Sequence, residues 1–343
     1  MVFGPLAGNN QSMDIQDLLP QVRQIAGRLV EELQRAELLT GGWKDEPLGQ
    51  ALVDASLSQS LDQLAATGCW GEENRLPSSE LWRIAGPMLQ RGALQYDARV
   101  KPRGYAGDYL MLLRICRHWR CDDPLGRLFD GYFQRQAAPH AVRARTEQVA
   151  AAAAWHCLQG KPGAYHVVSI GSGPALDLHQ ALSVLPESRR ATLRVTLVDV
   201  DPEALDLARQ QLAPLLPPAG LACVRTNLSR LPQPANAEKL PERAQLLLCT
   251  GLFDYLDQDA AVTMLRLFWQ RLAPGGLLLV GNFAPHNPSR AYMEWIGLWY
   301  LTYRTPEEIE QLALSAGIPR NRLAIGCDHT GLDLFLRAWK TDC

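Results

Sequence analysis

Residues 166–182, HVVSIGSGPALDLHQAL, predict a buried strand, a turn made by Gly171, Ser172 and Gly173, and an amphipathic helix. Glycines in such a turn allow a tight bend and let a ligand approach the backbone amides at the start of the helix. A dinucleotide fingerprint would need a glycine at position 176, where this chain has Leu176. The segment therefore predicts a ligand site at the turn and disfavours NAD or FAD as the ligand.

An acidic residue ends the next predicted strand. In TLRVTLVDVDPEAL, Asp199 stands at the carboxyl end of the strand, with Val200 beside it. Open α/β sheets bind ligands at the carboxyl ends of their strands, where an acid can accept both hydroxyls of a ribose. Either Asp199 or Asp201 could instead cap the following helix, whose first position is Pro202. We assign the cap to Asp201 and the ribose contact to Asp199.

Two later segments supply further candidate ligand contacts. Asn227 and Leu228 follow the third predicted strand, where an amide side chain suits the edge of an adenine base. The segment LCTGLFDYLDQD follows the fourth predicted strand and brings Gly251 and Phe253 to the same edge. Together with the glycine turn, these residues predict a nucleoside site.

The N-terminal part of the chain, which precedes these residues, is predicted to be all-helical. Apolar residues recur there every three or four positions, as on one face of an amphipathic helix. Such helices are expected over residues 14–39, 47–66, 78–91, 108–119, 124–136 and 139–158. We therefore predict a helical N-terminal domain over residues 1–158.

From residue 159 onward, short β-branched runs alternate with helical patterns, which is typical of a parallel sheet. Strands are expected near 166–170, 193–198, 221–225, 245–249 and 276–282, and helices near 174–185, 202–214, 257–272 and 305–316. Thr305, Pro306 and Glu308 predict a capping box at the last helix. The segments NRLAIGC and LDLFLRAW are close enough to pair antiparallel. The second predicted domain, residues 159–343, is thus of the α/β class.

The composition limits the classes of partner. The 343 residues are 47% hydrophobic and 20% charged, and the formal net charge is −2. These values are ordinary for a globular protein, and no run of Lys or Arg predicts a surface for nucleic acid or for an anionic membrane. A small-molecule partner is therefore favoured.

The cysteines and the start of the chain bear on its location. None of the eight cysteines forms a CxxC pair, so we expect reduced thiols and no metal site. The first residues, MVFGPLAGNNQSMDIQ, lack a basic segment followed by an apolar one. The sequence therefore predicts a cytoplasmic protein without membrane insertion.

The order of these segments, with its final hairpin, resembles the class I S-adenosylmethionine-dependent methyltransferases over about residues 163–340. The stretches KPRGYAGDYLM, GLFDYL, NFAPHNPSRAYMEWIGLWYLTYR and TGLDLFL narrow the resemblance to bacterial methyltransferases of the 3-hydroxypalmitic acid methyl ester biosynthesis type, over about residues 80–340. The resemblance implies a Rossmann-like sheet that is mostly parallel, an antiparallel C-terminal hairpin, and an all-α N-terminal domain. It also implies S-adenosylmethionine as the cofactor.

The resemblance gives the segment KPRGYAGDY a role as a loop of the helical domain that reaches over the cofactor. Arg103 would contact a carboxylate and Tyr105 the sulfonium, with Gly104 and Asp108 in the same loop. The alternative is a turn between helices with a salt bridge and a capping Asp108. Both interpretations remain open on the sequence alone.

Three activities are compatible with such a site. In the first, a methyltransferase, Asn282, Tyr255 and Arg290 would orient a small-molecule acceptor beside Tyr105, and His286 is a lesser candidate for a base. The second is a cyclase in which the amino group of S-adenosylmethionine attacks its own γ-carbon, giving azetidine-2-carboxylate and methylthioadenosine. The family commonly has an Asp and a His at positions held here by Leu298 and Tyr300, which keeps this alternative open. The third is a non-catalytic regulator that binds S-adenosylmethionine.

Overall fold

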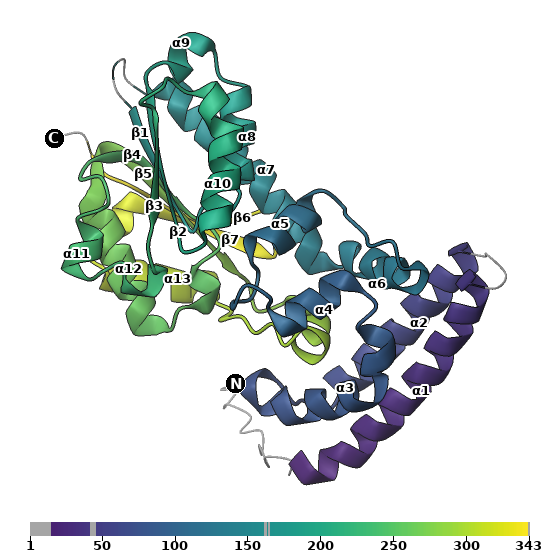
Figure 1. Cartoon of the computed structure of the whole chain (residues 1–343). Helices are drawn as coiled ribbons and strands as arrows, with labels where there is room; N and C mark the ends of the chain where they lie inside the picture. Colours follow the sequence, from purple (N-terminus) through teal and green to yellow (C-terminus); the bar gives the residue numbers. More distant parts are fainter. Residues whose placement is uncertain (1–14, 42–45, 161–162, 164, 342–343) are drawn as a thin grey trace, which may run out of the picture. The chain divides into compact units, whose positions relative to one another are not determined.

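The computed structural model describes residues 15–41, 46–160, 163 and 165–341. They form two compact units (Figure 1). Unit 1 contains the described residues up to Val100 together with Arg120–Phe133 and Arg290–Tyr300. Unit 2 contains Lys101–Trp119, Gln134–Ser289 and the described residues from Leu301 onward. The chain therefore passes between the units several times.

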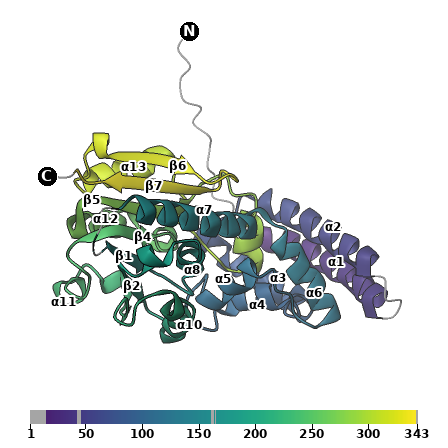
Figure 2. The same ribbon diagram turned by 90° about the horizontal axis from the view of Figure 1, so that it is seen from above.

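In the described part of unit 2, seven strands form one sheet in the order β3-β2-β1-β4-β5-β7-β6. The strands are β1 (Tyr165–Ile170), β2 (Leu193–Asp199), β3 (Leu221–Arg225), β4 (Ala244–Cys249), β5 (Leu272–Phe283), β6 (Leu323–Cys327) and β7 (Asp333–Trp339). Strands β1 to β5 pair in parallel, whereas β7 pairs antiparallel with both β5 and β6, which lie beside it in Figure 2. The predicted fold class, a Rossmann-like and mostly parallel sheet with an antiparallel C-terminal hairpin and a helical N-terminal region, is confirmed.

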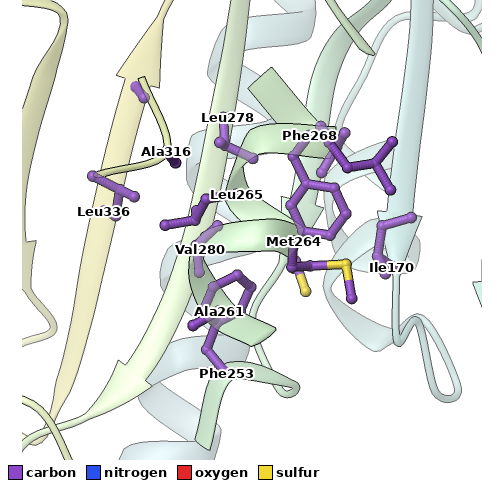
Figure 3. Packing of buried hydrophobic residues seen from close by; sticks show 14 of the residues in the cluster. Ile170, Phe253, Ala261, Met264, Leu265, Phe268, Leu278, Val280, Ala316 and Leu336 are labelled. Atoms are coloured by element: carbon purple, nitrogen blue, oxygen red, sulfur yellow. The ribbon is translucent and has the colours of Figure 1, made fainter. Parts of the chain in front are cut away.

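Helices cover both faces of this sheet because successive strand residues point to opposite sides. On one face, Val167 and Leu246 pack against α7 (Ala137–Gln159), α8 (Leu176–Ser183) and α10 (Pro202–Leu212). On the other face, Val168 and Leu247 pack against α12 (Gln258–Arg271) and α13 (Pro306–Ser315). Figure 3 shows Phe253, Met264 and Phe268 in this second layer. The site-bearing loops thus emerge from a rigid three-layer core.

Shorter elements connect these layers in unit 2. They are α5 (Tyr109–Cys116), α9 (Glu187–Arg190), η2 (Ala213–Leu215), η3 (Leu228–Arg230), α11 (Pro234–Ala237), η4 (Phe253–Tyr255) and η6 (Arg320–Arg322). Two of them, η3 and η4, follow the carboxyl ends of β3 and β4. They therefore stand where ligands of open α/β sheets bind.

Unit 1 is helical. It contains α1 (Ile15–Gly41), α2 (Glu46–Ala65), η1 (Gly71–Asn74), α3 (Arg75–Leu89), α4 (Ala93–Val100), most of α6 (Pro124–Gln134) and η5 (Tyr292–Ile296). Tyr292 ties η5 into this unit, because its hydroxyl donates to Gln95 Oε1 at 2.7 Å and its ring stacks on Phe133. No described helix is long and apolar enough to cross a membrane.

The division into units differs from the predicted boundary at residue 158. Helix α7 was expected in the N-terminal domain, but its apolar face, including Val149 and Ala153, packs with strand residues of the sheet. Residues 101–119 also belong to the sheet unit, whereas 290–300 belong to the helical one. Local periodicity predicts that a helix forms but not which layer it joins, which is the physical reason for the difference.

Most predicted elements agree with the observed ones, with several differences. Helix α4 was not predicted, and the predicted helix over 108–119 ends at Cys116. Strand β5 was expected near 276–282 but begins at Leu272. Its pairing with β4 skips from Leu272 to Leu277, so residues 273–276 form an irregularity within the strand. The predicted start at Asp14 lies outside the described residues. The capping box of Thr305 and Glu308 is confirmed.

Candidate functional site

A large hollow of unit 2 lies at the carboxyl ends of the central strands. The strand order reverses between β1 and β4, which is the point where open α/β sheets bind ligands. A cavity of about 530 Å³ is found there. Its walls come from the loop at 103–107, the glycine turn, the end of β2, residues 227–229 and residues 251–255. Segments far apart in the sequence therefore meet at one site.

The glycine turn adopts a left-handed backbone conformation, which favours glycine. Gly171 has a φ of 63° and Gly173 a φ of 50°, in the left-handed region. Ala175, at a φ of 51°, continues this bend as the N-cap of α8. Gly171 and Gly173 line the cavity, as predicted for a ligand that approaches the backbone closely.

Asp199 is clamped by backbone amides at the cavity wall. Its Oδ2 accepts from Gly173 N at 2.8 Å and its Oδ1 from Asp201 N at 2.9 Å. The side chain is 6% exposed, and burial raises the pKa of its carboxyl despite these amides. Its position beside the cavity, with Val200 next to it, agrees with the predicted ligand contact.

Asp201 caps α10, as predicted. Its Oδ1 accepts from Glu203 N at 2.9 Å, and Pro202 is the first helical residue. The same carboxylate also binds Arg103, whose Nη2 donates to Oδ1 at 2.8 Å and whose Nε pairs with Oδ2. Arg103 Nη1 donates to Glu203 at 3.0 Å, and its guanidinium lies 4.7 Å from the centre of the Tyr109 ring.

These contacts change the interpretation of the segment at 101–109. The structure places the Arg103 guanidinium on two protein carboxylates rather than leaving it for a ligand carboxylate, which matches the salt-bridge alternative. Asp108 caps α5 by accepting from Leu110 N and Met111 N, which is the other half of that alternative. The expectation that the loop belongs to the helical domain was wrong, because it packs on α10 of the sheet unit. The loop still lines the cavity through Arg103, Gly104 and Tyr105.

Two loop residues face the cavity as expected. Gly104 has a φ of 87°, which favours glycine. The Tyr105 hydroxyl donates to Asp201 Oδ2 at 3.4 Å. Burial, reinforced by Asp199 and Asp201, raises the pKa of Tyr105 well above its ordinary value, so the phenol stays protonated at neutral pH. In this contact the tyrosine is a hydrogen-bond donor.

The residues after β3 and β4 fall into different environments. Asn227 and Leu228 line the cavity, and Asn227 Oδ1 also caps η3 by accepting from Ser229 N at 3.0 Å. Gly251 and Tyr255 line the cavity as well. Phe253 does not, because its ring is buried in the core against Phe268.

Two of the predicted orienting groups lie elsewhere. Asn282 is buried, and its Nδ2 donates to Asp254 Oδ1, Phe283 O and Thr302 O at 2.9 to 3.1 Å. Its Oδ1 accepts from Arg304 Nη1 at 2.6 Å, so its amide is used within the core. Arg290 belongs to unit 1, where its Nε donates to Glu294 at 2.7 Å and its guanidinium covers the Trp70 ring.

The sequence analysis missed several residues of the cavity wall. These are Ala106, Tyr109, Leu112, Ser229 and Leu252. Tyr109 and Leu112 could have been found, because they are three positions apart in the helix that Asp108 caps and so share one face. For the remaining three residues, no sequence pattern predicts a position at the cavity.

Comparisons with known proteins support the fold. No protein-family model matches the sequence, and no curated protein matches it. A solved structure from Bordetella parapertussis, described as a possible exported protein, is similar with a TM-score of 0.54 and 20% identity, covering 93% of this chain and 97% of that chain.

Two solved methyltransferases have lower scores. The CurJ carbon methyltransferase has a TM-score of 0.47 and 12% identity, covering 95% of this chain and 98% of that chain. The mitomycin 7-O-methyltransferase has a TM-score of 0.43 and 18% identity, covering 95% of this chain and 96% of that chain.

Proposed function

We propose that the protein binds S-adenosylmethionine in the large cavity and transfers its methyl group to a small molecule. The observation that carries this proposal is the Asp199 carboxylate, which two backbone amides hold beside the cavity. A carboxylate offers about four lone-pair positions, so two amide contacts leave capacity for the two hydroxyls of a ribose. The volume of about 530 Å³ lies in the usual range of small-molecule pockets.

The remaining wall supports one orientation of the ligand. Asn227 and Leu228 stand after β3, next to Asp199 on the neighbouring strand, and suit an adenine ring and its polar edge. Gly171 and Gly251 stand after β1 and β4, on the other side of Asp199 in the sheet order. The sulfur would then lie toward β4, near Tyr105 and Tyr255.

Bound S-adenosylmethionine would supply a methyl group on a positively charged sulfur, ready for in-line displacement by the acceptor. The chain has to hold that sulfur, align the acceptor and exclude water. The rings of Tyr105 and Tyr255 suit a cation, because the face of an aromatic ring attracts positive charge. The loop held by Arg103 forms one wall and limits access of water to the reacting atoms.

The acceptor is expected to supply its own nucleophile. Tyr105 keeps its proton at neutral pH, and we assign Asp199 to the ribose. Asn282 and Arg290, which were predicted to orient the acceptor, are engaged in other contacts. The cyclase and the regulator remain predictions, and no contact among the described residues favours either one.

The test is to identify the adenosine product. Purified protein is incubated with methyl-labelled S-adenosylmethionine alone, and then with a panel of small carboxylic acids, phenols and amines. We expect S-adenosylhomocysteine and labelled acceptor only when a suitable acceptor is present. Methylthioadenosine formed without any acceptor would contradict methyl transfer and support cyclisation or lysis. Asp206→Asn, on the exposed face of α10, is the matched control for an Asp199→Asn variant.

A further inference from the structure

The cavity residue Tyr255 stands on a short element that its own backbone stabilises weakly. Element η4 spans three residues. Its turn is closed by Tyr255 N, which donates to Leu252 O at 3.0 Å, and by Leu256 N, which donates to Phe253 O at 3.2 Å. A single 3₁₀ turn forms few hydrogen bonds for the backbone freedom that it loses. Contacts from other parts of the chain are therefore needed to hold Tyr255 at the cavity wall.

Arg304 supplies two of these contacts from one guanidinium. Its Nη1 donates to Phe253 O at 2.8 Å and its Nη2 donates to Leu256 O at 2.5 Å. These two carbonyls lie on either side of Asp254 and Tyr255 in the sequence, so the planar fork of the arginine spans the whole turn. A lysine carries a point charge without this fork and does not reproduce the arrangement.

The guanidinium is itself held in place. Arg304 is buried, its N donates to Phe283 O at 3.2 Å, and its Nη1 also donates to Asn282 Oδ1 at 2.6 Å. The next residue, Thr305, is the N-cap of α13, which fixes the chain directly after the arginine. Arg304 therefore reaches η4 from a rigid part of the sheet unit.

Within η4, Tyr255 is the residue that lines the cavity. Phe253 is buried in the core (Figure 3), and Asp254 is buried as well, with its backbone O accepting from Thr302 N at 2.7 Å. Asp254 Oδ1 accepts from Phe283 N at 2.7 Å. Tyr255 follows these anchored residues and is 41% exposed, in the wall of the large cavity. A shift of the turn would therefore move its ring relative to the cavity.

We propose that Arg304 is a positioning residue for methyl transfer, which holds η4 so that the ring of Tyr255 faces the sulfonium of bound S-adenosylmethionine. An aromatic ring attracts a cation that lies over its face within about 6 Å of its centre, so a small displacement of the turn weakens the contact. Arg304 is buried and is not part of the described cavity wall, so its effect on the ligand passes through Tyr255. The inference rests on the proposed function, because it concerns the ligand proposed there.

The charge of the ligand sulfur tests this assignment. S-adenosylmethionine and S-adenosylhomocysteine share the adenosine and the amino acid group, but only the first carries a positive sulfur. Titration calorimetry of both ligands on the whole protein, without an acceptor, compares their affinities. Tyr255→Leu keeps an apolar side chain and removes the ring. We expect it to weaken S-adenosylmethionine about tenfold and S-adenosylhomocysteine less than about twofold, because a cation–π contact acts only on the charged sulfur.

Arg304→Gln should reproduce this selective loss, weakening S-adenosylmethionine about fivefold or more and S-adenosylhomocysteine less than about twofold. Combined with Tyr255→Leu, it should add less than about twofold, because a residue that acts through Tyr255 has no further effect once the ring is absent. Arg266→Gln is the matched control, since the exposed Arg266 also donates to a backbone carbonyl, Ser315 O, at 3.1 Å. It should leave both affinities unchanged.

A second variant covers a failure to fold. Burial raises the pKa of Asp254 to about 6, and the charges of Arg145 and Arg304 act in the opposite direction. If Arg304→Gln does not fold because this charge is lost, Arg304→Lys decides the question. It keeps the charge but lacks the fork, so it should show the same selective loss.

The outcomes separate the two claims. Parallel weakening of both ligands in a folded Arg304 variant, no weakening of either, or a loss that adds to that of Tyr255→Leu would overturn the positioning role while leaving adenosine binding intact. An unchanged preference between the ligands in Tyr255→Leu would overturn it as well. Failure of the folded wild type to bind either ligand would overturn the proposed function, and this inference with it.

Discussion

Arg103, in the loop before α5, and Asp201, at the start of α10, are joined by an ion pair in which Arg103 Nη2 donates to Asp201 Oδ1 at 2.8 Å. Asp201 N in turn donates to Asp199, the carboxylate assigned to the ribose. The contact therefore links one wall of the cavity to the residue on which the proposed function depends. It also explains why a segment rich in glycine and tyrosine interrupts the helices at this point.

Breaking this ion pair should destabilise the protein. Arg103→Ala leaves the buried Asp201 carboxylate with fewer donors, and we expect the free energy of unfolding to fall by about 2 kcal/mol. Arg209→Ala, which removes an exposed pair with Asp206 on the same helix, should cost no more than about 1 kcal/mol. Urea denaturation measures both. Equal losses in the two variants would show that the Arg103 pair acts like any surface pair.

The ion pair of Arg103 with Asp201 should also make the stability of the protein depend on pH in the acid range. Burial would raise the pKa of Asp201, but Arg103 and Glu203 N outweigh burial and the pKa is lowered overall. A lowered pKa stabilises the folded protein above the unfolded value of about 4, and this contribution is lost as the pH falls through the folded value.

We therefore expect the stability difference between wild type and Arg103→Ala to be constant from about pH 7 to about pH 5 and to shrink below about pH 4. Denaturation curves across this range give the difference directly. A difference that stays constant down to about pH 3 would mean that the contact does not depend on the Asp201 charge.

We expect Asn282 to stabilise the fold and to take no part in catalysis. Its amide holds Asp254, Arg304 and two backbone carbonyls in the core, so Asn282→Ala should lower the free energy of unfolding by about 2–4 kcal/mol. The exposed Asn321→Ala should change it by less than about 0.5 kcal/mol. Calorimetry should find near-normal binding of S-adenosylhomocysteine to the folded fraction. Unchanged stability with lost turnover would restore the predicted catalytic role.

Two substitutions of Tyr105 distinguish a role of its ring from a role of its hydroxyl. If its face supports the sulfonium, a cation–π contact of about 2 kcal/mol predicts that Tyr105→Ala loses about thirtyfold in kcat/KM. Tyr105→Phe keeps the ring and loses the hydroxyl with its 3.4 Å contact to Asp201, so it should retain most activity. Severe and equal damage from both variants would point to proton transfer. Little damage from either would remove Tyr105 from the site.

Much of the sheet unit could be predicted from the sequence because its signals are local. Buried parallel strands appear in the sequence as short β-branched runs. The capping box at Thr305 consists of two residues that are three positions apart. The glycine turn and Asp199 were found for the same reason, since each stands directly after a recognisable strand.

The remaining features depend on contacts that no local pattern contains. Arg103 contacts Asp201, which is 98 positions away in the sequence. The amide of Asn282 finds its partners in two other segments, at Asp254 and at residues 302–304. The periodicity of a helix predicts that a polar side chain on its apolar face is buried. It does not predict which residue that side chain contacts.

The most direct test of the central claim is titration calorimetry of S-adenosylhomocysteine against wild type, Asp199→Ala and Asp206→Ala. The account predicts that the wild type binds, that Asp206→Ala binds equally well, and that Asp199→Ala loses about a hundredfold or more, because two charge-assisted hydrogen bonds of about 1.5–3 kcal/mol each disappear. Folding of each variant is checked by its thermal unfolding curve. Unchanged affinity in a folded Asp199→Ala variant would contradict the assignment of this cavity as the nucleoside site.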